Sequence, residues 1–236
     1  MVLGGGSNML VGDKGFEGIT ARLTGDFCDV RFHKETVYAG AGTRTSALVN
    51  DCAEMELSGF EGLAGVPGTL GGALIGNAGT AGGWIEDAVK SVELLSTSGK
   101  VRMVPREKIK FFYRGSNLDG KIVLGAVLHL KKAQKNDILN KIEAVLYRRN
   151  ESQPTGTWNA GSVFKNPQED SAGRLIEACG LKGLVFGGAE ISGKHANFII
   201  NKGSAKASDV KALISTIHQK VKERFGIELE LEIKLI

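Results

Sequence analysis

Two glycine-rich segments limit what this chain can fold into more than any other feature of its sequence. The first reads LGGGSN at residues 3–8, and the second reads GVPGTLGGALIGNAG at residues 65–79. Because glycine has no Cβ, a glycine run lets the backbone approach a bound group closely, and its N–H groups can converge on an anion. Ser7 and Asn8 add side-chain donors at the end of the first run. The first segment therefore predicts a phosphate cradle.

One glycine run alone is equally compatible with a bare loop, and the first segment lacks the Gly-x-Gly-x-x-Gly pattern that opens a helix in Rossmann domains. The second segment favours a ligand, since one chain rarely uses two such segments only for turns. Two walls lined by backbone suit a long ligand with a pyrophosphate, such as a dinucleotide. The alternative is a tightly turned structural loop in which Pro67 sets the bend.

Composition excludes several classes of protein. Of the 236 residues, 42% are hydrophobic and 24% are charged, which is ordinary for a soluble globular protein. The net charge is only +4, and Lys and Arg are scattered among Asp and Glu, so no basic block indicates a nucleic-acid partner. No signal peptide or membrane-length apolar segment is present, so we expect a cytoplasmic protein without membrane insertion. Nothing in the sequence indicates an oligomeric state.

The cysteines and histidines do not indicate a metal site. Cys28, Cys52 and Cys179 are odd in number and widely spaced, which fits neither a zinc site nor a disulfide framework. We expect them to be buried free thiols in a reducing compartment. No two histidines have the spacing of metal ligands, so the sequence predicts no bound metal.

The hydrophobic pattern predicts an α+β chain in two parts. Residues 1–131 are rich in short strands, residues 137–236 are more helical, and the polar segment 131–136 is the candidate linker. A strict alternation over residues 227–236 predicts a closing strand, the clearest in the sequence. The other predicted strands cover residues 18–23, 28–32, 36–39, 89–95, 100–104, 122–130 and 196–201, and the predicted helices cover residues 45–55, 137–149, 172–179 and a run that starts near residue 208.

Four side chains outside the glycine segments are candidates for chemistry. Arg114 can hold a carboxylate by two parallel hydrogen bonds, although an isolated arginine is more often a surface residue. Ser162 can donate a proton, but it lacks the Gly-x-Ser-x-Gly elbow of an acyl-transfer nucleophile, and a turn serine is the alternative. Alternation puts Glu232 on one face of the closing strand, where a solvated edge is the default interpretation. His195 has polar neighbours and is the most suggestive histidine.

Taken together, these motifs resemble the UDP-N-acetylenolpyruvoylglucosamine reductase (MurB) family along nearly the whole chain. The motifs that carry the resemblance are, in order, LGGGSN at 3–8, GVPGTLGGALIGNAG at 65–79, YRGS at 113–116, AGSVFKNP at 160–167, GKHANF at 193–198 and ELELEIKLI at 228–236. The resemblance implies an FAD-binding fold of the vanillyl-alcohol-oxidase (PCMH) type in residues 1–131. It also implies a MurB C-terminal substrate-binding domain in residues 137–236, whose final strand reaches back to the active site.

The resemblance also implies roles for individual residues. Arg114, Ser162 and Glu232 correspond to the catalytic residues of the family, and Asn166 and His195 correspond to residues that contact the substrate. The residues implied to bind FAD are Gly4, Gly5, Gly6, Ser7, Asn8, Pro67, Gly68, Gly71, Gly72, Asn77, Ala78 and Gly79.

The implied reaction is the reduction of UDP-N-acetylglucosamine enolpyruvate to UDP-N-acetylmuramate in peptidoglycan synthesis. NADPH would reduce the flavin, and the flavin would pass a hydride to C3 of the enolpyruvyl ether. Ser162 would then protonate C2, while Arg114 and Glu232 would stabilise the charge that develops on C2 and the neighbouring carboxylate.

Two features distinguish this chain within the family. The family normally has a segment before LGGGSN whose strands complete the flavin subdomain, so we expect its lack here to weaken FAD binding. Only 48 positions (162 − 114) separate Arg114 from Ser162, so the chain resembles the branch without a tyrosine-bearing substrate loop. The alternatives are another flavin oxidoreductase of the same fold, or a nucleotide-sugar-binding module that has lost its flavin.

Overall fold

The computed structural model describes residues 1–236 and divides by backbone contacts into two compact units. The first unit consists of Met1–Gly5 and Ile19–Arg148, and the second of Gly6–Gly18 and Arg149–Ile236. The chain therefore passes from the first unit to the second within the first glycine segment, returns, and leaves again at the end of a long helix. A split into flavin and substrate domains at residues 131 and 137 stays a prediction; the contacts place the division at Arg148–Arg149.

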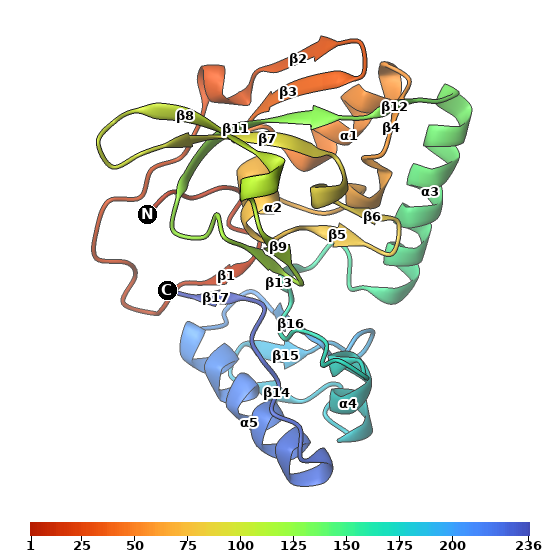
Figure 1. Ribbon diagram of the computed structural model, residues 1–236. Coiled ribbons are helices and arrows are strands. Elements are labelled where there is room, and N and C mark those ends of the chain that lie inside the picture. The colour runs from red at the N-terminus through yellow and green to blue at the C-terminus, as the bar shows by residue number, and fades with distance from the viewer. The chain divides into compact units, whose positions relative to one another are not determined.

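The first unit is built on an antiparallel five-stranded sheet (Figure 1). Its strand order is β2 (Val30–His33), β3 (Thr36–Gly40), β11 (Ile122–His129), β7 (Val89–Leu95) and β8 (Val101–Pro105). The central strand β11 is buried from Val123 to Ala126, and Ala126 pairs with Ala39 on one side and Val92 on the other. These small and β-branched side chains suit a strand that is covered on both faces.

Three helices complete the first unit: α1 (Thr45–Glu54), α2 (Leu70–Ile75) and α3 (Lys135–Ser152), of which α3 crosses the boundary at Arg148–Arg149 and ends in the second unit. Helix α2 packs against β3 and β11, and α3 buries the predicted apolar stripe Ile138, Ile142 and Val145. The short elements of this unit are η1 (Gly25–Cys28), β4 (Leu57–Ser58), η2 (Glu61–Leu63), β5 (Gly79–Thr80), β6 (Gly83–Trp84), η3 (Ile85–Asp87), η4 (Arg106–Lys108), β9 (Phe111–Phe112), β10 (Gly115–Ser116) and β12 (Lys131–Lys132).

The second unit contains a four-stranded antiparallel sheet and two helices. The strand order is β13 (Trp158–Ser162), β16 (Phe198–Asn201), β15 (Ala189–Ile191) and β14 (Val185–Phe186). Helix α5 (Ala207–Phe225) packs on β14, β15 and α4 (Ala172–Ala178) through the predicted stripe that includes Leu213 and Ile217. Two short strands, β1 (Met9–Leu10) and β17 (Lys234–Leu235), pair in parallel.

The segment 6–18 is tied into the second unit through Gly12 and Asp13, near its middle. Gly12 donates its N–H to the carbonyl oxygen of Ile236 at 2.8 Å. The Asp13 carboxylate accepts the N–H of Ala207 at 2.5 Å and that of Ser208 at 3.0 Å, so it caps the first turn of α5. These backbone hydrogen bonds lower the pKa of Asp13 from its ordinary value. A carboxylate near the start of the chain thus satisfies donors at the start of its last helix.

Several sequence predictions about individual elements are wrong, because neither the hydrophobic periodicity nor the polarity of a segment identifies the strand with which it pairs. Residues 18–23 form no strand beyond a single bridge between Val2 and Ala21, and Ile19 is 84% exposed. The predicted linker 131–136 instead supplies β12, which pairs with β4, and the first two residues of α3. The closing strand is regular only at β17, although its backbone is hydrogen-bonded further back.

The cysteines are all free, but only one is fully buried. Burial raises the pKa of the Cys52 thiol to about 12, so this thiol is inert at neutral pH. Cys179 is half-buried, and Cys28 is exposed, which corrects the expectation of three buried thiols.

Candidate active site

The two glycine segments touch each other in the first unit. A Cβ on Gly4 would lie 2.6 Å from Thr69 Oγ1, and a Cβ on Gly5 would lie 2.7 Å from the Cα of Gly68. Gly4 thus packs on the Thr69 side chain and Gly5 on the backbone of Gly68, and a Cβ at either position would be too close to its neighbour. The N–H groups of Gly4 and Gly5 donate no hydrogen bond within the protein. They are therefore open donors of the kind that a pyrophosphate requires.

The glycines of the second segment have different local roles. Gly71 donates its N–H to Ala41 O at 2.9 Å, and a Cβ there would meet the Ala41 Cβ at 3.1 Å, so Gly71 serves close packing. A Cβ on Gly72 would meet nothing closer than Thr69 Oγ1 at 3.8 Å, and Gly72 is exposed. The carbonyl oxygen of Gly79 accepts a hydrogen bond from Arg114. Of these three glycines, Gly72 is the one with room for a ligand.

Asn77 carries a buried acceptor without a protein donor. It is 1% exposed and has a left-handed backbone, with φ at 43°. Its Nδ2 donates to Glu86 Oε1 at 2.8 Å and to Phe112 O at 3.1 Å, while its Oδ1 has no partner. Leaving such an acceptor unmet costs about 1–3 kcal/mol, and a ligand N–H can meet it. The open amides of Gly4 and Gly5 together with this orphaned oxygen fit FAD, which brings both phosphates and a ring N–H.

Arg114 is held in the first unit more firmly than a surface arginine. It follows Tyr113 in the two-residue turn between β9 and β10, and its φ of 56° is rare for a residue other than glycine. Its Nη1 donates to Gly79 O at 3.1 Å, and its guanidinium carbon lies 5.1 Å from the centre of the Trp84 ring. Backbone strain of this kind concentrates at functional sites. These features argue against the interpretation of Arg114 as an ordinary surface arginine.

A β-bulge presents Ser162 at the end of β13 in the second unit. The pairing of β13 with β16 shifts between Asn159 and Ser162, and Gly161 within the shift has φ at 80°. Asn159 Oδ1 accepts the Gly161 N–H at 2.9 Å and fixes the bulge. Bulges next to active sites redirect a side chain. Ser162 is thus part of a bulged strand end and not of a simple turn.

The second unit brings Glu232 next to Ser162 through the backbone. Glu232 donates its N–H to the carbonyl oxygen of Val163 at 2.8 Å, and Lys165 donates to Glu230 O, also at 2.8 Å. Glu230 is exposed and paired with Lys165 at 3.0 Å, as a solvated strand face predicts, whereas Glu232 is half-buried. Of the predicted catalytic residues, Ser162 and Glu232 lie on neighbouring backbone segments of the second unit, and Arg114 belongs to the first unit.

The two predicted substrate residues, Asn166 and His195, both lie next to α4. Asn166 Oδ1 accepts the N–H of Ala172, the first residue of the helix, at 3.1 Å. His195 Nδ1 accepts the N–H of Asn197 at 3.2 Å, so the neutral ring carries its proton on Nε2. Burial, and secondarily the charge of Lys182, lowers the pKa of His195. His195 is therefore a neutral donor at physiological pH.

Gly173 packs against the predicted substrate residue His195, a contact that the sequence does not reveal. A Cβ on this residue would lie 2.8 Å from His195 Cε1, so the helix leaves room for the imidazole ring only because position 173 is glycine. No signal in the sequence links a helical glycine to a histidine 22 positions later (195 − 173). Trp84, which flanks Arg114, was missed for the same reason.

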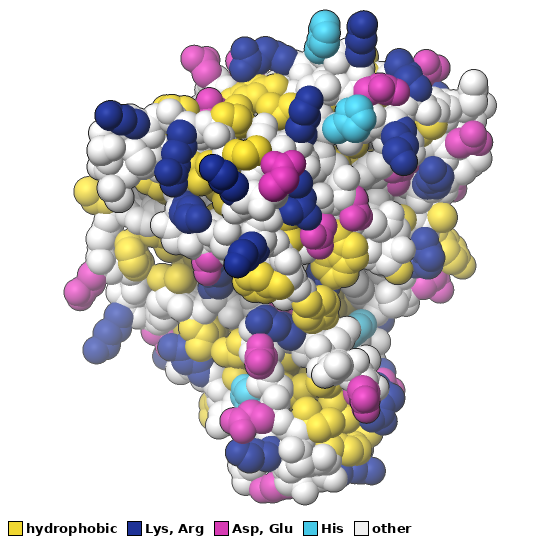
Figure 2. Space-filling view, viewed as in Figure 1, with side chains coloured by type: hydrophobic (Ala, Val, Ile, Leu, Met, Phe, Trp, Pro, Cys, Tyr) yellow, Lys and Arg dark blue, Asp and Glu magenta, His cyan; other side chains and the backbone are white.

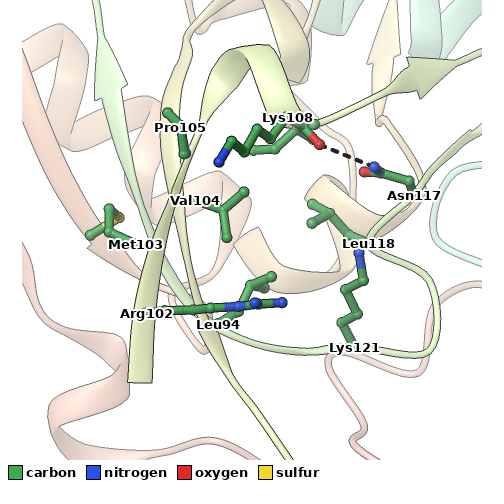
Figure 3. A pocket seen from close by; sticks show the side chains of 10 residues that line it. Leu94, Arg102, Met103, Val104, Pro105, Lys108, Asn117, Leu118 and Lys121 are labelled. Atoms are coloured by element: carbon green, nitrogen blue, oxygen red, sulfur yellow. Dashed lines mark hydrogen bonds between the residues drawn. The ribbon is translucent and has the colours of Figure 1, made fainter. Parts of the chain in front are cut away.

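A cavity of about 260 Å³ lies at the edge strand β8 of the first unit. Arg102, Lys108 and Lys121 surround a floor that includes Leu94 and Leu118 (Figure 3). Lys and Arg side chains gather on this face of the unit (Figure 2). None of the residues predicted for the active site lines this cavity.

Comparison with known families places these features in context. Residues 1–104 match an FAD-binding domain, and residues 153–236 match the C-terminal domain of UDP-N-acetylenolpyruvoylglucosamine reductase. The chain is therefore a flavoprotein of the class in which an FAD-binding domain precedes a substrate-binding domain, as the sequence predicted.

Individual relatives cover nearly the whole chain. The UDP-N-acetylenolpyruvoylglucosamine reductase of Syntrophomonas wolfei is 40% identical over 100% of this chain and 79% of its own length. The reductase of Moorella thermoacetica is 43% identical over 99% of this chain and 78% of its own length. The crystal structure of the Thermus caldophilus enzyme (MurB) superposes with a TM-score of 0.89 at 42% identity, over 100% of this chain and 84% of that one. The chain belongs to the UDP-N-acetylenolpyruvoylglucosamine reductase family.

No helix of the structure combines the length and the apolar character that crossing a membrane requires.

Proposed function

We propose that this chain catalyses the NADPH-dependent reduction of UDP-N-acetylglucosamine enolpyruvate to UDP-N-acetylmuramate, a step of peptidoglycan synthesis, with FAD as its cofactor. The observation that carries the proposal is the juxtaposition of Ser162 and Glu232. The hydrogen bond from Glu232 N–H to Val163 O joins the backbone of a half-buried glutamate to the residue that follows Ser162 at a bulged strand end. Family membership supports the proposal, because the relatives are named for this reaction.

Bound FAD supplies the hydride transfer that connects NADPH with the carbon–carbon double bond of the substrate. Gly4 and Gly5 would hold its pyrophosphate through their open N–H groups, and Asn77 Oδ1 would accept a ring N–H. Asn77 is held by the two hydrogen bonds of its Nδ2, so its Oδ1 is oriented before a ligand binds.

The protonation of the substrate is assigned to residues of the second unit. Ser162 Oγ delivers a proton to C2 of the enolpyruvyl group while C3 receives the hydride. A hydroxyl is a weak acid, so the transfer requires a strongly basic carbon at close range. Glu232 hydrogen-bonds the carboxylate of the same group as negative charge spreads into it. The bulge at Gly161 and the backbone anchor at Val163 set the positions of both side chains.

Arg114 neutralises the charge that develops on the substrate carboxylate. A guanidinium makes two parallel hydrogen bonds to a carboxylate, and charge stabilisation of this kind is usually the largest contribution of the protein. Its anchoring to Gly79 O and its place beside the Trp84 ring limit the conformations that it must give up on binding. His195 and Asn166 bind the nucleotide-sugar part, with the neutral His195 donating through Nε2.

The proposal is tested by a turnover assay with defined products. Protein saturated with FAD should oxidise NADPH only when UDP-N-acetylglucosamine enolpyruvate is present, and the product should be heavier by two hydrogen atoms in the mass spectrum. NADPH oxidation that depends on oxygen and leaves the enolpyruvyl compound unchanged would instead indicate a flavin oxidase. Absence of flavin binding would indicate a nucleotide-sugar-binding module.

A further inference from the structure

We propose that Asn8 is a positioning residue for Glu232. Asn8 lies at the end of the first glycine segment, where the sequence assigns it to the cofactor. In the structure the side-chain Nδ2 of Asn8 donates to the backbone carbonyl oxygen of Glu232 at 3.1 Å. The backbone carbonyl oxygen of Asn8 accepts the N–H of Lys234, also at 3.1 Å. The inference rests on the proposed function, because it assumes that the Glu232 carboxylate acts on the substrate.

The two hydrogen bonds of Asn8 hold the chain on either side of Ile233, at the carbonyl group of Glu232 and at the N–H of Lys234. On the other side of Glu232, its N–H is bound by Val163 O at 2.8 Å. The backbone of Glu232 is therefore fixed through both its N–H and its carbonyl group. The side-chain amide of Asn8 supplies one of these two anchors.

Asn8 acts where the closing segment changes its partner. Before this point, the segment bonds to residues 163–165, through Lys165 N to Glu230 O and Glu232 N to Val163 O. After it, the segment bonds to residues 8–10, through Lys234 N to Asn8 O and the pairing of β17 with β1. A strand that leaves one partner for another has no continuous ladder to hold it. A side-chain donor at the change of partner compensates for the missing ladder.

An amide is required for this contact. Asparagine offers an N–H₂ group that can donate to a carbonyl oxygen, whereas the isosteric aspartate offers only acceptors. Asn8→Asp therefore replaces an attraction by a repulsion without changing the size of the side chain. The change displaces Glu232 and not Ser162, whose strand is held separately by the bulge at Asn159 and Gly161.

The two half-reactions separate the roles of Asn8. Asn8→Asp and Asn8→Ala should leave flavin reduction by NADPH at the wild-type rate and slow flavin reoxidation by the enolpyruvyl substrate about 10- to 100-fold, as expected for a misplacement of about 1 Å. Asn201→Asp is the matched control, because Asn201 uses its Oδ1 to accept from Gly203 N and Ala205 N, and aspartate keeps that acceptor. It should reoxidise at the wild-type rate.

A double-mutant cycle distinguishes positioning from a general loss of structure. In a Glu232→Gln background, Asn8→Ala should slow reoxidation much less than it does in the wild-type protein. Full additivity of the two changes would overturn the inference, as would wild-type reoxidation in both Asn8 variants. A loss of FAD affinity in Asn8→Ala with unchanged reoxidation at saturating FAD would return Asn8 to the cofactor site. If Glu232→Gln alone has no effect on reoxidation, the assignment of Glu232 in the proposed function fails instead.

Discussion

Gly5→Ala tests whether the contact between the two glycine segments builds the flavin cradle. The added Cβ would lie 2.7 Å from the Cα of Gly68. Carbon atoms attract best at about 3.5–4.0 Å, so the two backbones must separate by roughly 0.8 Å or more. Overpacking of this kind costs about 1–3 kcal/mol. Flavin-free protein can relieve the strain by letting the loop move away, but the bound state needs the loop in place.

The strain therefore falls mainly on the complex and should weaken FAD binding roughly 5- to 150-fold. Calorimetric titration of flavin-free protein with FAD measures the change, and circular dichroism checks that the variant folds. Gly193→Ala is the matched control, because a Cβ at that position meets no atom within 4 Å. It should bind FAD with wild-type affinity. Wild-type affinity in folded Gly5→Ala would refute the argument that the close contact forms the cradle.

Three further changes address other parts of the account. Arg114→Lys should fold but lose most turnover with the enolpyruvyl substrate, because an ammonium group cannot make a planar two-point contact; wild-type turnover would remove Arg114 from the site. Gly173→Ala should push the His195 ring out of place and raise KM for the nucleotide sugar several-fold, while the rate of flavin reduction by NADPH stays constant. Asp13→Asn should lower the melting temperature at neutral pH, with a difference from wild type that shrinks below about pH 4. The sign follows from the lowered pKa of Asp13, since its stabilising effect is present above the ordinary pKa and is lost as the carboxylate is protonated in the fold; an equal difference at every pH would contradict this.

The parts of the fold that the sequence predicts are those with a local periodic signal. The strand-type run of β7 identifies an element, and the apolar stripe around Leu213 and Ile217 in α5 identifies both an element and its buried face. Alternation reveals a face but not a partner. The closing segment alternates as a strand does, yet it divides its hydrogen bonds between residues 163–165 and 8–10 and is regular only at its end.

For the candidate site, too, the sequence identifies residues but not the contacts between distant segments. Motifs identify the residue types of Arg114, Ser162 and Glu232, because each type suits one task in the chemistry. They do not reveal the contact between Asn8 and Glu232, which spans 224 positions, or the left-handed turn that holds Arg114. Both depend on chain segments that meet only after folding.

The central claim is that the second unit supplies the proton to C2 through Ser162, and Ser162→Ala tests it most directly. Anaerobic stopped-flow measurements follow the visible absorbance of the flavin through both half-reactions. We predict that NADPH bleaches the flavin of the variant at the wild-type rate. We also predict that the enolpyruvyl substrate restores the absorbance roughly 10²- to 10⁴-fold more slowly than in the wild type, the usual contribution of a positioned proton donor. Reoxidation of the variant at the wild-type rate would contradict the account.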